Sequence, residues 1–325
     1  MKLSVCIPIY NGENCLEEAL NSLKSQTRLP DEVIIRDDCS TDNGSEVIKK
    51  FNDLNIDFSR NNENLGCTGN WNKCLQESSG DIVTFLHQDD GFEPRFLENL
   101  EKDFQNNMNK IGMWYCNTHI KDTQSHASDK TSRLQSGQES IRNIFTWDEA
   151  PAPTGVSFKG ATLKDIGFYD PKYKIACEPD LYFRIVLGGY SIYKSEENLV
   201  WRTLPPTRAT NTFGGTERYY SEWMMFLEDH SSNSNLVDKN MINRALFNFY
   251  NHTSSSIISN ITRLRFSEVT GTLRIIFSRA RKFEEKYGVR SMNYIKFFAL
   301  LIKSMTKIFY LFVRRNLALA YRRIK

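Results

Sequence analysis

The chain has 325 residues, of which 40% are hydrophobic, 25% charged and 12% aromatic, and its formal net charge is +3. These proportions are those of a globular protein and exclude a low-complexity, collagen-like or disordered chain. The length suffices for one large domain or two ordinary ones. The charge is uneven, because residues 261–325 contain 16 Lys or Arg and 3 Asp or Glu. The positive charge therefore gathers in the C-terminal part.

The seven cysteines are scattered and form neither a Cys-x-x-Cys motif nor a zinc-type spacing with histidine. We expect them to be unpaired, mostly buried thiols in a reducing cytosol. The N-terminal stretch MKLSVCIPIYNG is expected to be a strand and not a signal peptide, since it lacks a small-residue cleavage site and Pro8 and Asn11-Gly12 interrupt its apolar run. The sequence thus predicts a cytoplasmic location.

Up to about residue 116, short apolar runs alternate with segments of helical periodicity. Strands are predicted at Leu3–Ile9, Glu32–Arg36, Asn55–Phe58, Asp81–Leu86 and Ile111–Cys116, and helices at Glu13–Gln26, Ser45–Phe51, Thr68–Glu77 and Pro94–Phe104. Such alternation with short connections predicts an α/β fold with a parallel, doubly wound sheet. Ligands of these sheets gather at the carboxyl ends of the strands.

Polar clusters follow three of the predicted strands. They read Pro8-Ile-Tyr-Asn11, Asp37-Asp38-Cys-Ser-Thr-Asp42 and His87-Gln-Asp-Asp90. The adjacent carboxylates of Asp89 and Asp90 repel each other unless they are solvated in a turn, which Gly91 would suit, or bind a divalent cation. Because the three clusters fall on one edge of the sheet, they predict a ligand site there.

The rest of the chain is predicted more coarsely. Residues 117–145 are polar and are expected to form a loop, with His119 and His126 solvated. A strand and a helix are expected within 151–174, and then a helix that opens with Glu178 and Asp180 and ends at Gly188-Gly189. Another strand follows, and beyond about residue 216 the pattern is helical.

The segment 291–325 is predicted to be a basic amphipathic helix. Residues 286–325 contain ten basic residues and no acidic one. No apolar run reaches the roughly 20 residues that span a bilayer. We expect this helix to lie on an anionic membrane surface, and the alternative is that it packs on the rest of the protein with its lysines in solvent. Nucleic acid is not an expected partner, since the front of the chain is acidic.

Four segments occur in this order over about residues 2–205: SVCIPIYNGENCLEEALNSLKSQ, DEVIIRDDCSTDNG, NENLGCTGNWNKCLQESSGDIVTFLHQDD and CEPDLYFRIVLGGY. Together they resemble glycosyltransferase family 2. The resemblance implies a GT-A fold, which is a Rossmann-like, mostly parallel sheet flanked by helices. It predicts a GT-A domain at 1–215, with a nucleotide-binding half at 1–116 and an acceptor half at 117–215. The helical, basic region 216–325 follows as an extension.

The resemblance also implies a Mn²⁺ or Mg²⁺ ion at the end of the fourth strand. The family has an Asp-x-Asp region where this chain has His87-Gln-Asp-Asp90. Asp89 is the first expected ligand and Asp90 the second, and His87, which stands in place of the first Asp, is a third candidate. Such a cation would stabilise the departing phosphate as a Lewis acid.

The nucleotide of the donor is expected to bind at the ends of the first two strands, near the Asn-x-Gly motif and beside the metal. The residues expected there are Pro8, Tyr10, Asn11, Asp37, Asp38, Asn64, Gly66 and Gln88. Which of Asp37 and Asp38 meets the base stays open. Ser40 is expected to be the N-cap of the next helix.

The general base is expected at Glu178, because the acidic pair that precedes Asp-Leu-x-x-Arg in the family aligns with Cys177-Glu178. Asp180 is the rival candidate. Arg202 or Arg208 is expected to contact the diphosphate near a loop with Gly214-Gly215. Single displacement needs no covalent intermediate, so no cysteine is expected to act as a nucleophile.

These implications predict an inverting glycosyltransferase that uses a UDP- or dTDP-sugar. The expected acceptor is a lipid-linked oligosaccharide or polysaccharide at the inner face of the cell membrane, in the synthesis of a surface polysaccharide such as O-antigen or capsule. The oligomeric state is left open. One alternative is a degenerate member that binds nucleotide and membrane without turnover. The other is a sugar-1-phosphate nucleotidyltransferase.

Overall fold

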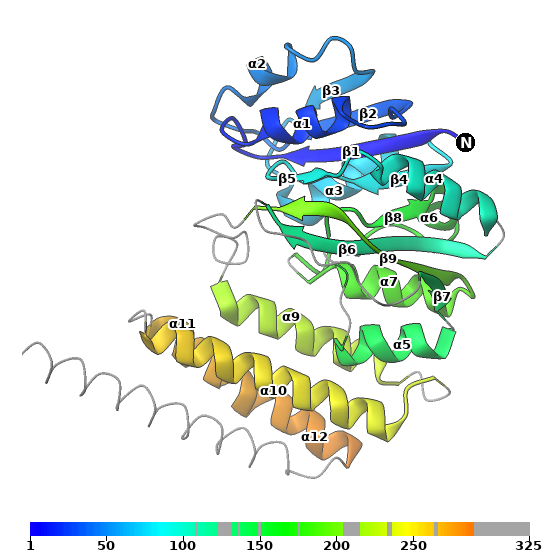
Figure 1. Ribbon diagram of the computed structural model, residues 1–325. Coiled ribbons are helices and arrows are strands. Elements are labelled where there is room, and N and C mark those ends of the chain that lie inside the picture. The colour runs from blue at the N-terminus through cyan, green and yellow to red at the C-terminus, as the bar shows by residue number, and fades with distance from the viewer. Residues whose placement is uncertain are drawn as a thin grey trace, which may run out of the picture. The chain divides into compact units, whose positions relative to one another are not determined.

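The computed structural model describes residues 1–107, 110–121, 132–135, 137–148, 151, 153–174, 176–203, 215–232, 236–262 and 266–288 (Figure 1). The chain divides into two compact units. Residues 1–144 and 149–207 form the first, which we call the sheet unit, and residues 145–148 and 208–325 form the second, the helical unit. Arg208 and the predicted basic helix 291–325 lie outside the described residues.

Up to Asn106 the sheet unit follows the strand–helix order that the sequence predicts, except for an additional short strand at Asp90–Phe92. Its elements are β1 (Leu3–Ile9), α1 (Leu16–Lys24), β2 (Glu32–Asp37), α2 (Gly44–Ile48), β3 (Ile56–Arg60), α3 (Gly66–Glu77), β4 (Ile82–Phe85), β5 (Asp90–Phe92), α4 (Phe96–Asn106), β6 (Ile111–Ile120), β7 (Arg133–Gln135), α5 (Gly137–Thr146), β8 (Ser157–Lys159), α6 (Gly160–Ile166), α7 (Glu178–Leu187) and β9 (Ser191–Arg202).

The strands form one mixed sheet in the order β3-β2-β1-β4-β8-β6-β9-β5, with β7 paired to β9. The pairs β1·β2, β1·β4, β2·β3 and β6·β9 are parallel, and the pairs made by β5, β7 and β8 are antiparallel. The parallel part, β3-β2-β1-β4, is the part that the strand–helix alternation predicts. It therefore brings the carboxyl ends of β1, β2 and β4 to one edge.

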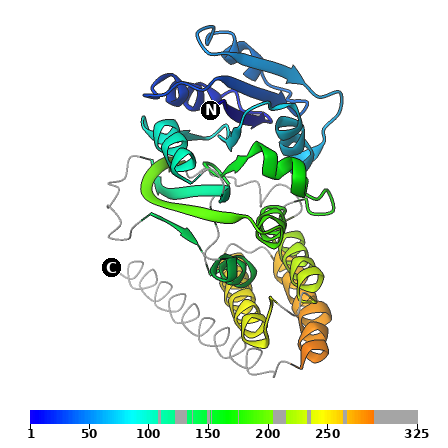
Figure 2. The ribbon, with the colours of Figure 1, turned by 90° about the vertical axis from the view of Figure 1, so that its right-hand side faces the viewer.

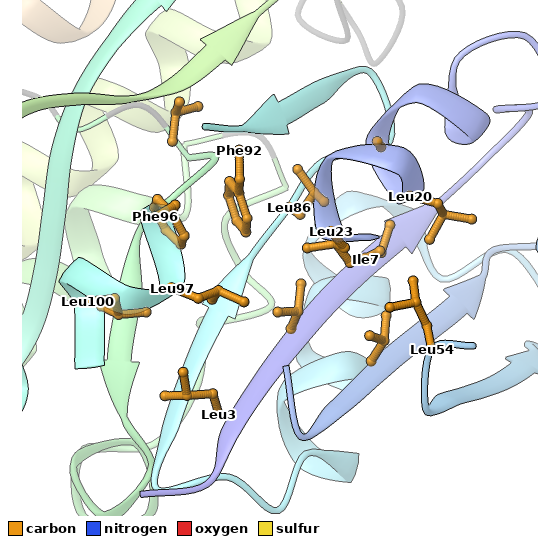
Figure 3. Packing of buried hydrophobic residues seen from close by; sticks show 14 of the residues in the cluster. Leu3, Ile7, Leu20, Leu23, Leu54, Leu86, Phe92, Phe96, Leu97 and Leu100 are labelled. Atoms are coloured by element: carbon orange, nitrogen blue, oxygen red, sulfur yellow. The ribbon is translucent and has the colours of Figure 1, made fainter. Parts of the chain in front are cut away.

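Helices cover both faces of this parallel part. Alternate residues of β1, among them Leu3 and Ile7, pack in one core with α1, α2 and α4. Figure 3 shows Leu20 and Leu23 of α1 lying close to Ile7 on this face of the sheet. The helix α3 packs on β1 and β2. Each fully buried leucine contributes about 1.5–3 kcal/mol to the free energy of folding, so this core holds the strand ends rigidly.

The prediction that residues 117–145 form a loop is wrong for the part of this range that the structure describes, which leaves out residues 122–131, with His126, and residue 136. Strand β6 continues to Ile120 in parallel pairing with β9, β7 adds a further strand, and α5 runs from Gly137 to Thr146. The polar side chains find partners far along the chain, since the Asn117 amide donates to Glu196 and the Gln135 amide donates to the Tyr115 hydroxyl. His119 is largely buried, with Nε2 at 3.3 Å from Glu93 Oε1, and is not solvated. Long-range pairing overrides local polarity here.

The helical unit contains α9 (Gly215–His230), α10 (Lys239–Thr262), α11 (Phe266–Ile275), the π-helix η1 (Ile276–Ala280) and α12 (Arg281–Tyr287). Helices α9, α10 and α11 lie side by side (Figures 1 and 2). The Trp223 ring is buried among Trp147, Tyr220 and Phe249. Among the described helices, none has an apolar stretch long enough to cross a bilayer.

Candidate active site

The parallel register brings the three predicted polar clusters to the same edge of the sheet. Strand β1 pairs through Ile9 with Asp37 of β2, and through Cys6 with Phe85 of β4. The residues that follow each strand therefore leave the sheet at neighbouring positions. The three polar clusters therefore lie next to one another at this edge, as the sequence predicts.

Gln88 fastens the turn after β4 to the end of β1. Its Oε1 accepts a hydrogen bond from the backbone N–H of Tyr10 at 2.8 Å, and its Nε2 donates to the Tyr10 carbonyl at 3.0 Å. A Cβ atom at Gly12 would lie 2.5 Å from Gln88 Oε1, so the glycine leaves room for the Gln88 amide to form both hydrogen bonds. The Tyr10 ring is 41% exposed, and Pro8 beside it is partly buried.

Asn11 is likewise bonded to the protein. Its backbone has φ +51°, a left-handed conformation that asparagine tolerates better than most residues. Its N–H donates to Ser40 Oγ at 2.9 Å, and its Oδ1 accepts from the Thr41 N–H at 2.8 Å. Asn11 therefore joins the loop after β1 to the loop after β2.

Asp37 and Asp38 are buried, and their carboxylates are bonded on every side. Asp37 accepts hydrogen bonds from the Ser40 N–H and hydroxyl, with Arg60 Nη1 at 3.4 Å. Ser40 thus closes its own turn and is not the N-cap of α2, which begins after Asn43; that prediction is wrong.

The Asp38 carboxylate holds the loop before α3. It accepts from the Leu65 N–H at 2.7 Å, the Gly66 N–H at 2.9 Å and Asn61 Nδ2 at 3.0 Å. Asn64 Nδ2 donates to the Asp38 carbonyl at 3.0 Å. Gly66 has φ +72°, a left-handed conformation that glycine adopts without steric cost, which explains why this position is a glycine. The Asn-x-Gly motif is therefore brought against the end of β2, as the prediction requires.

Asp90 is the buried member of the second acidic pair. It lies in β5 opposite Arg202 of β9, whose Nε is 3.8 Å from Asp90 Oδ2. The Thr154 hydroxyl donates to Asp90 Oδ2, and the Thr203 N–H donates to Oδ1 at 3.3 Å. Burial, followed by repulsion from Asp89, raises the pKa of Asp90 to about 6, although the Thr154 hydrogen bond opposes the rise.

Gly91, which also lies in β5, is explained by packing and not by a turn. The residue faces Trp201 across the β5·β9 pair, and a Cβ atom would lie 1.9 Å from the indole ring. Any side chain at this position would force the ring away from the strand. The end of β9, and with it Arg202, is therefore held close to the Asp89-Asp90 turn.

Asp89 differs from the other three carboxylates. It is only partly buried, and its side chain forms no hydrogen bond or ion pair with the described part of the chain. Its position is nevertheless defined, because the Thr203 hydroxyl donates to the Asp89 carbonyl at 2.6 Å and the Asp90 N–H donates to the His87 carbonyl at 3.1 Å. Asp89 is thus a free carboxylate on a rigid turn.

The His87 imidazole, two residues before Asp89 in the chain, has one ring nitrogen that is enclosed and has no partner in the described part of the chain. Its Nε2 is shielded from solvent and forms no hydrogen bond, and the ring contacts the edges of Trp71 and Phe85 at centroid distances of 5.0 and 6.3 Å. Burial lowers the pKa of His87 to about 4; Arg202 acts in the same direction and Asp89 in the opposite one. The imidazole is therefore neutral at pH 7 and offers a lone pair.

Helix α7 positions the two candidate bases, Glu178 and Asp180. Asp180 is buried and accepts a hydrogen bond from Arg184 Nε at 2.8 Å, one turn along the helix. The same guanidinium donates to the carbonyls of Ile166 and Phe168. Asp180 is therefore part of a structural ion pair. Glu178 is only partly buried, and the Cys177 thiol lies 3.9 Å from its Oε2.

Aromatic side chains connect the two parts of the site. The Trp71 ring of α3 contacts both His87 and Tyr169, which precedes α7, at centroid distances of 5.0 and 5.4 Å. The negative charges of Glu178 and Asp38 both raise the pKa of Cys67 in α3, although burial is the larger cause. Helix α3 therefore contacts both the end of β2, where Asp38 accepts from the Gly66 N–H, and the segment before α7, through Trp71 and Tyr169.

Burial keeps three thiols near the site, those of Cys15, Cys67 and Cys177, in the protonated form. Burial, with smaller contributions from Asp89 and Asp42, raises the pKa of Cys15 to about 11. Burial also raises the pKa values of Cys67 and Cys177. Thiolates are the nucleophilic form of cysteine, so this environment does not favour a covalent intermediate on sulfur.

Several residues of the site escaped the sequence analysis. They are Arg60, Asn61, Trp71, Thr154 and Thr203. Arg60 could have been found, since it ends the third strand at the same edge as the other clusters. Thr154 and Thr203 carry no such signal, because only the tertiary structure brings them to Asp90.

Whether a divalent cation fits this site depends on which side chains have donor atoms that are not already hydrogen-bonded to the protein. No group of three or more His, Cys, Asp or Glu side chains in the described ranges is arranged to hold a metal. Asp89 has a free carboxylate and His87 an unpartnered nitrogen, and both atom types bind divalent cations. The residues therefore fit a cation that takes its other ligands from substrate phosphates and water, as Mg²⁺ commonly does.

Comparison with known sequences relates part of this chain to a family. Residues 4–156 match the family described as Glycosyl transferase family 2. An uncharacterised glycosyltransferase of Rickettsia typhi is 27% identical over 236 residues, which cover 70% of this chain and 71% of that protein. A Campylobacter jejuni protein named GalNAc(5)-diNAcBac-PP-undecaprenol beta-1,3-glucosyltransferase is 38% identical over 92 residues, which cover 27% of this chain and 30% of that protein.

Solved structures of TarS from S. aureus share the fold. One aligns with a TM-score of 0.60 at 24% identity and covers 78% of this chain and 44% of that one. TarS 1-349 in complex with UDP-GlcNAc aligns with a TM-score of 0.58 at 20% identity and covers 89% of this chain and 92% of that one. At this identity the likeness shows the fold alone, and it confirms the GT-A fold predicted from the sequence.

Proposed function

This chain belongs to glycosyltransferase family 2 over residues 4–156, and from that premise we propose that it transfers a sugar from a UDP- or dTDP-sugar to an acceptor hydroxyl with inversion. The observation that carries the proposal is the Asp89 carboxylate, which has no partner in the described part of the chain and lies on a rigid turn between His87 and Asp90, the residue that Arg202 approaches. Such a turn is suited to a donor diphosphate and its metal ion.

The nucleotide would bind at the ends of β1 and β2. The exposed Tyr10 ring offers a surface for stacking on a base or ribose. Pro8 and the Asn64–Gly66 loop border the same edge. The donor in the TarS complex is UDP-GlcNAc, which supports a uridine nucleotide for this chain. Asn11, Asp37, Asp38 and Gln88 would act mainly by holding the two loops in place.

Asp89 would hold the Mn²⁺ or Mg²⁺ ion, and Asp90 would position Arg202. When bound, the metal supplies Lewis-acid stabilisation of the charge that develops on the departing diphosphate. The Arg202 guanidinium adds a fixed positive charge on the same side, because its side chain is held opposite Asp90. Asp90 itself is buried and bonded to Thr154 and Thr203, which makes it a positioning residue.

Glu178 would take the proton of the acceptor hydroxyl as general base. It is more accessible than Asp180, whose carboxylate is bonded to Arg184. The Campylobacter relative is named for an undecaprenol-linked acceptor, which supports a lipid-linked acceptor here. The ten basic residues of 286–325 support a peripheral position on an anionic membrane surface in the cytoplasm.

The test is release of nucleoside diphosphate from a panel of UDP-, dTDP- and GDP-sugars with Mn²⁺, Mg²⁺ or EDTA. We expect metal-dependent release from one donor, and a loss of about 10³-fold in Asp89→Ala, since a Lewis acid contributes several kcal/mol. Asp53→Ala is the matched control, because Asp53 is an exposed aspartate paired with Lys24 on the surface. Absence of both release and metal-dependent nucleotide binding would overturn the proposal and favour the degenerate alternative.

A further inference from the structure

Helix α3 is hydrogen-bonded to the end of strand β2. The Gly66 N–H donates to Asp38 Oδ2 at 2.9 Å, and Asn70 Nδ2, whose side chain is buried, donates to the Arg36 carbonyl at 2.9 Å. Arg36 is part of β2 and Asp38 directly follows it. Because the nucleotide of the donor is proposed to bind at this end of β2, these two bonds fix α3 relative to the nucleotide.

Another face of α3 is hydrogen-bonded to the segment that leads into α7. Thr68 is buried, and its hydroxyl donates to the Tyr173 carbonyl at 2.7 Å. Asn72 Nδ2 donates to the Tyr169 carbonyl at 2.8 Å, and Asn72 Oδ1 accepts from the Tyr169 N–H at 3.0 Å. Thr68 and Asn72 share one face of the helix, because they are four residues apart. They therefore hold the main chain of this segment at two points.

The segment held in this way leads to the candidate base. Tyr173 lies five positions before Glu178, which is the first residue of α7. From the other side, Arg184 of α7 donates to the carbonyls of Ile166 and Phe168. Helix α7 also packs on β6 and β9. That packing fixes the axis of α7, whereas the hydrogen bonds from α3 fix the chain that enters its first turn.

We propose that Asn72 and Thr68 are positioning residues for sugar transfer, which fix Glu178 relative to the nucleotide end of β2 through hydrogen bonds made by α3. The inference rests on the proposed function, in which the donor binds at that end and Glu178 takes the acceptor proton. Transfer requires the base, the acceptor oxygen and the donor carbon to be aligned, and a displacement of about 1 Å can cost about 10²-fold in rate. The two side chains act on the rate through Glu178 and not through contact with the reacting atoms.

The test measures kcat and KM of full-chain variants for the donor from which the wild type releases nucleoside diphosphate. Asn72→Ala and Thr68→Val should each lower kcat by about 10²-fold. The KM for the donor should stay unchanged, because both variants keep the bonds between α3 and the end of β2. Thr68→Ser should keep the wild-type kcat, because serine retains the hydroxyl that donates to the Tyr173 carbonyl.

Asn99→Ala is the matched control for the loss of stability that Asn72→Ala causes. Asn99 is also a helix residue whose amide bonds to a distant element of the same unit: it is buried on α4, and its Nδ2 donates to Glu197 Oε2 of β9 at 2.8 Å. Asn99→Ala should lower the unfolding midpoint and keep the wild-type kcat. An equal loss of kcat in Asn99→Ala and Asn72→Ala would mean that reduced stability, and not the position of Glu178, causes the effect.

Combination with Glu178→Gln separates this inference from the function on which it rests. If Asn72 acts through Glu178, adding Asn72→Ala to Glu178→Gln should lower kcat at most about twofold further, because the group that Asn72 positions has already lost its role. Effects that multiply, or an unchanged kcat in Asn72→Ala and Thr68→Val, would overturn the inference and leave the transferase standing. Full turnover in Glu178→Gln would instead overturn the assignment of the base, which belongs to the proposed function, and the inference with it.

Discussion

The two acidic pairs at the edge of the sheet have the same sequence but differ in how many of their carboxylates are bonded to the protein. Asp37 and Asp38 are both buried, and backbone N–H groups, a hydroxyl, an amide and a guanidinium surround their carboxylates. In the second pair, Asp90 is equally bonded, whereas the Asp89 carboxylate has no protein partner in the described chain. Carboxylates bonded on every side stabilise loops, and a carboxylate left free on a rigid turn is available to a ligand.

A contrast in burial is found at the start of α7. Asp180 is buried in an ion pair with Arg184, while Glu178, two residues earlier, is only partly buried. In the proposed function, Asp180 and Asp90 build the site, and Glu178 and Asp89 perform the chemistry. Substitutions of the two kinds should therefore separate stability from activity.

The largest contrast is expected between Glu178→Gln and Asp180→Asn. The first should lower turnover about 10²–10⁴-fold, because glutamine cannot accept a proton, with an unchanged unfolding midpoint. The second should cost about 3–5 kcal/mol of stability, because it leaves the Arg184 charge without its partner. Initial rates and urea unfolding measure the two effects. A stable, inactive Asp180→Asn would reverse the assignment of the base.

The next largest effect is a loss of stability on substitution of Asp38, and substitution of Asp89 provides the comparison. Asp38→Ala would leave the Leu65 N–H without an acceptor and would remove one of the two acceptors of both the Gly66 N–H and the Asn61 amide, at a cost of about 1–3 kcal/mol. Asp89→Asn should unfold at the same temperature as the wild type. Thermal unfolding in EDTA measures both, and a large loss of stability in Asp89→Asn would mean that its carboxylate is structural after all.

The smallest effect is expected in the pH dependence of Asp90. Its pKa of about 6 in the folded protein lies above its ordinary value of 3.8, so the folded state binds the proton more tightly than the unfolded state. Stability from this group should therefore be lost as the pH rises from about 4 to about 6, by about 1–2 kcal/mol. Asp90→Asn, which resembles the protonated acid, should not show this loss.

The free energy of unfolding of the wild type and of Asp90→Asn is measured between pH 4 and 7 in EDTA. We expect the wild type to be more stable relative to Asp90→Asn at pH 4 than at pH 7. A relative stability that rises with pH would mean that Arg202 dominates over burial at this carboxylate.

The sequence by itself determined the order of the strands and helices up to Asn106, except for the short strand β5, and the edge at which the polar clusters meet. Both follow from periodicity and chain order, because parallel strands with helical crossovers leave few topologies open. The part beyond Cys116 was not predictable in this way. Strand β6 extends to Ile120 through pairing with β9, whose residues lie about 80 positions further along the chain.

Only the tertiary structure decided which carboxylates are free. The partners of Asp38 lie 23 to 28 residues away, and those of Asp90 lie 64 and 113 residues away. Identical Asp-Asp pairs therefore cannot be told apart locally. A carboxylate becomes structural when distant donors converge on it, and it stays available to a cation when none does. That convergence is a property of the packed fold.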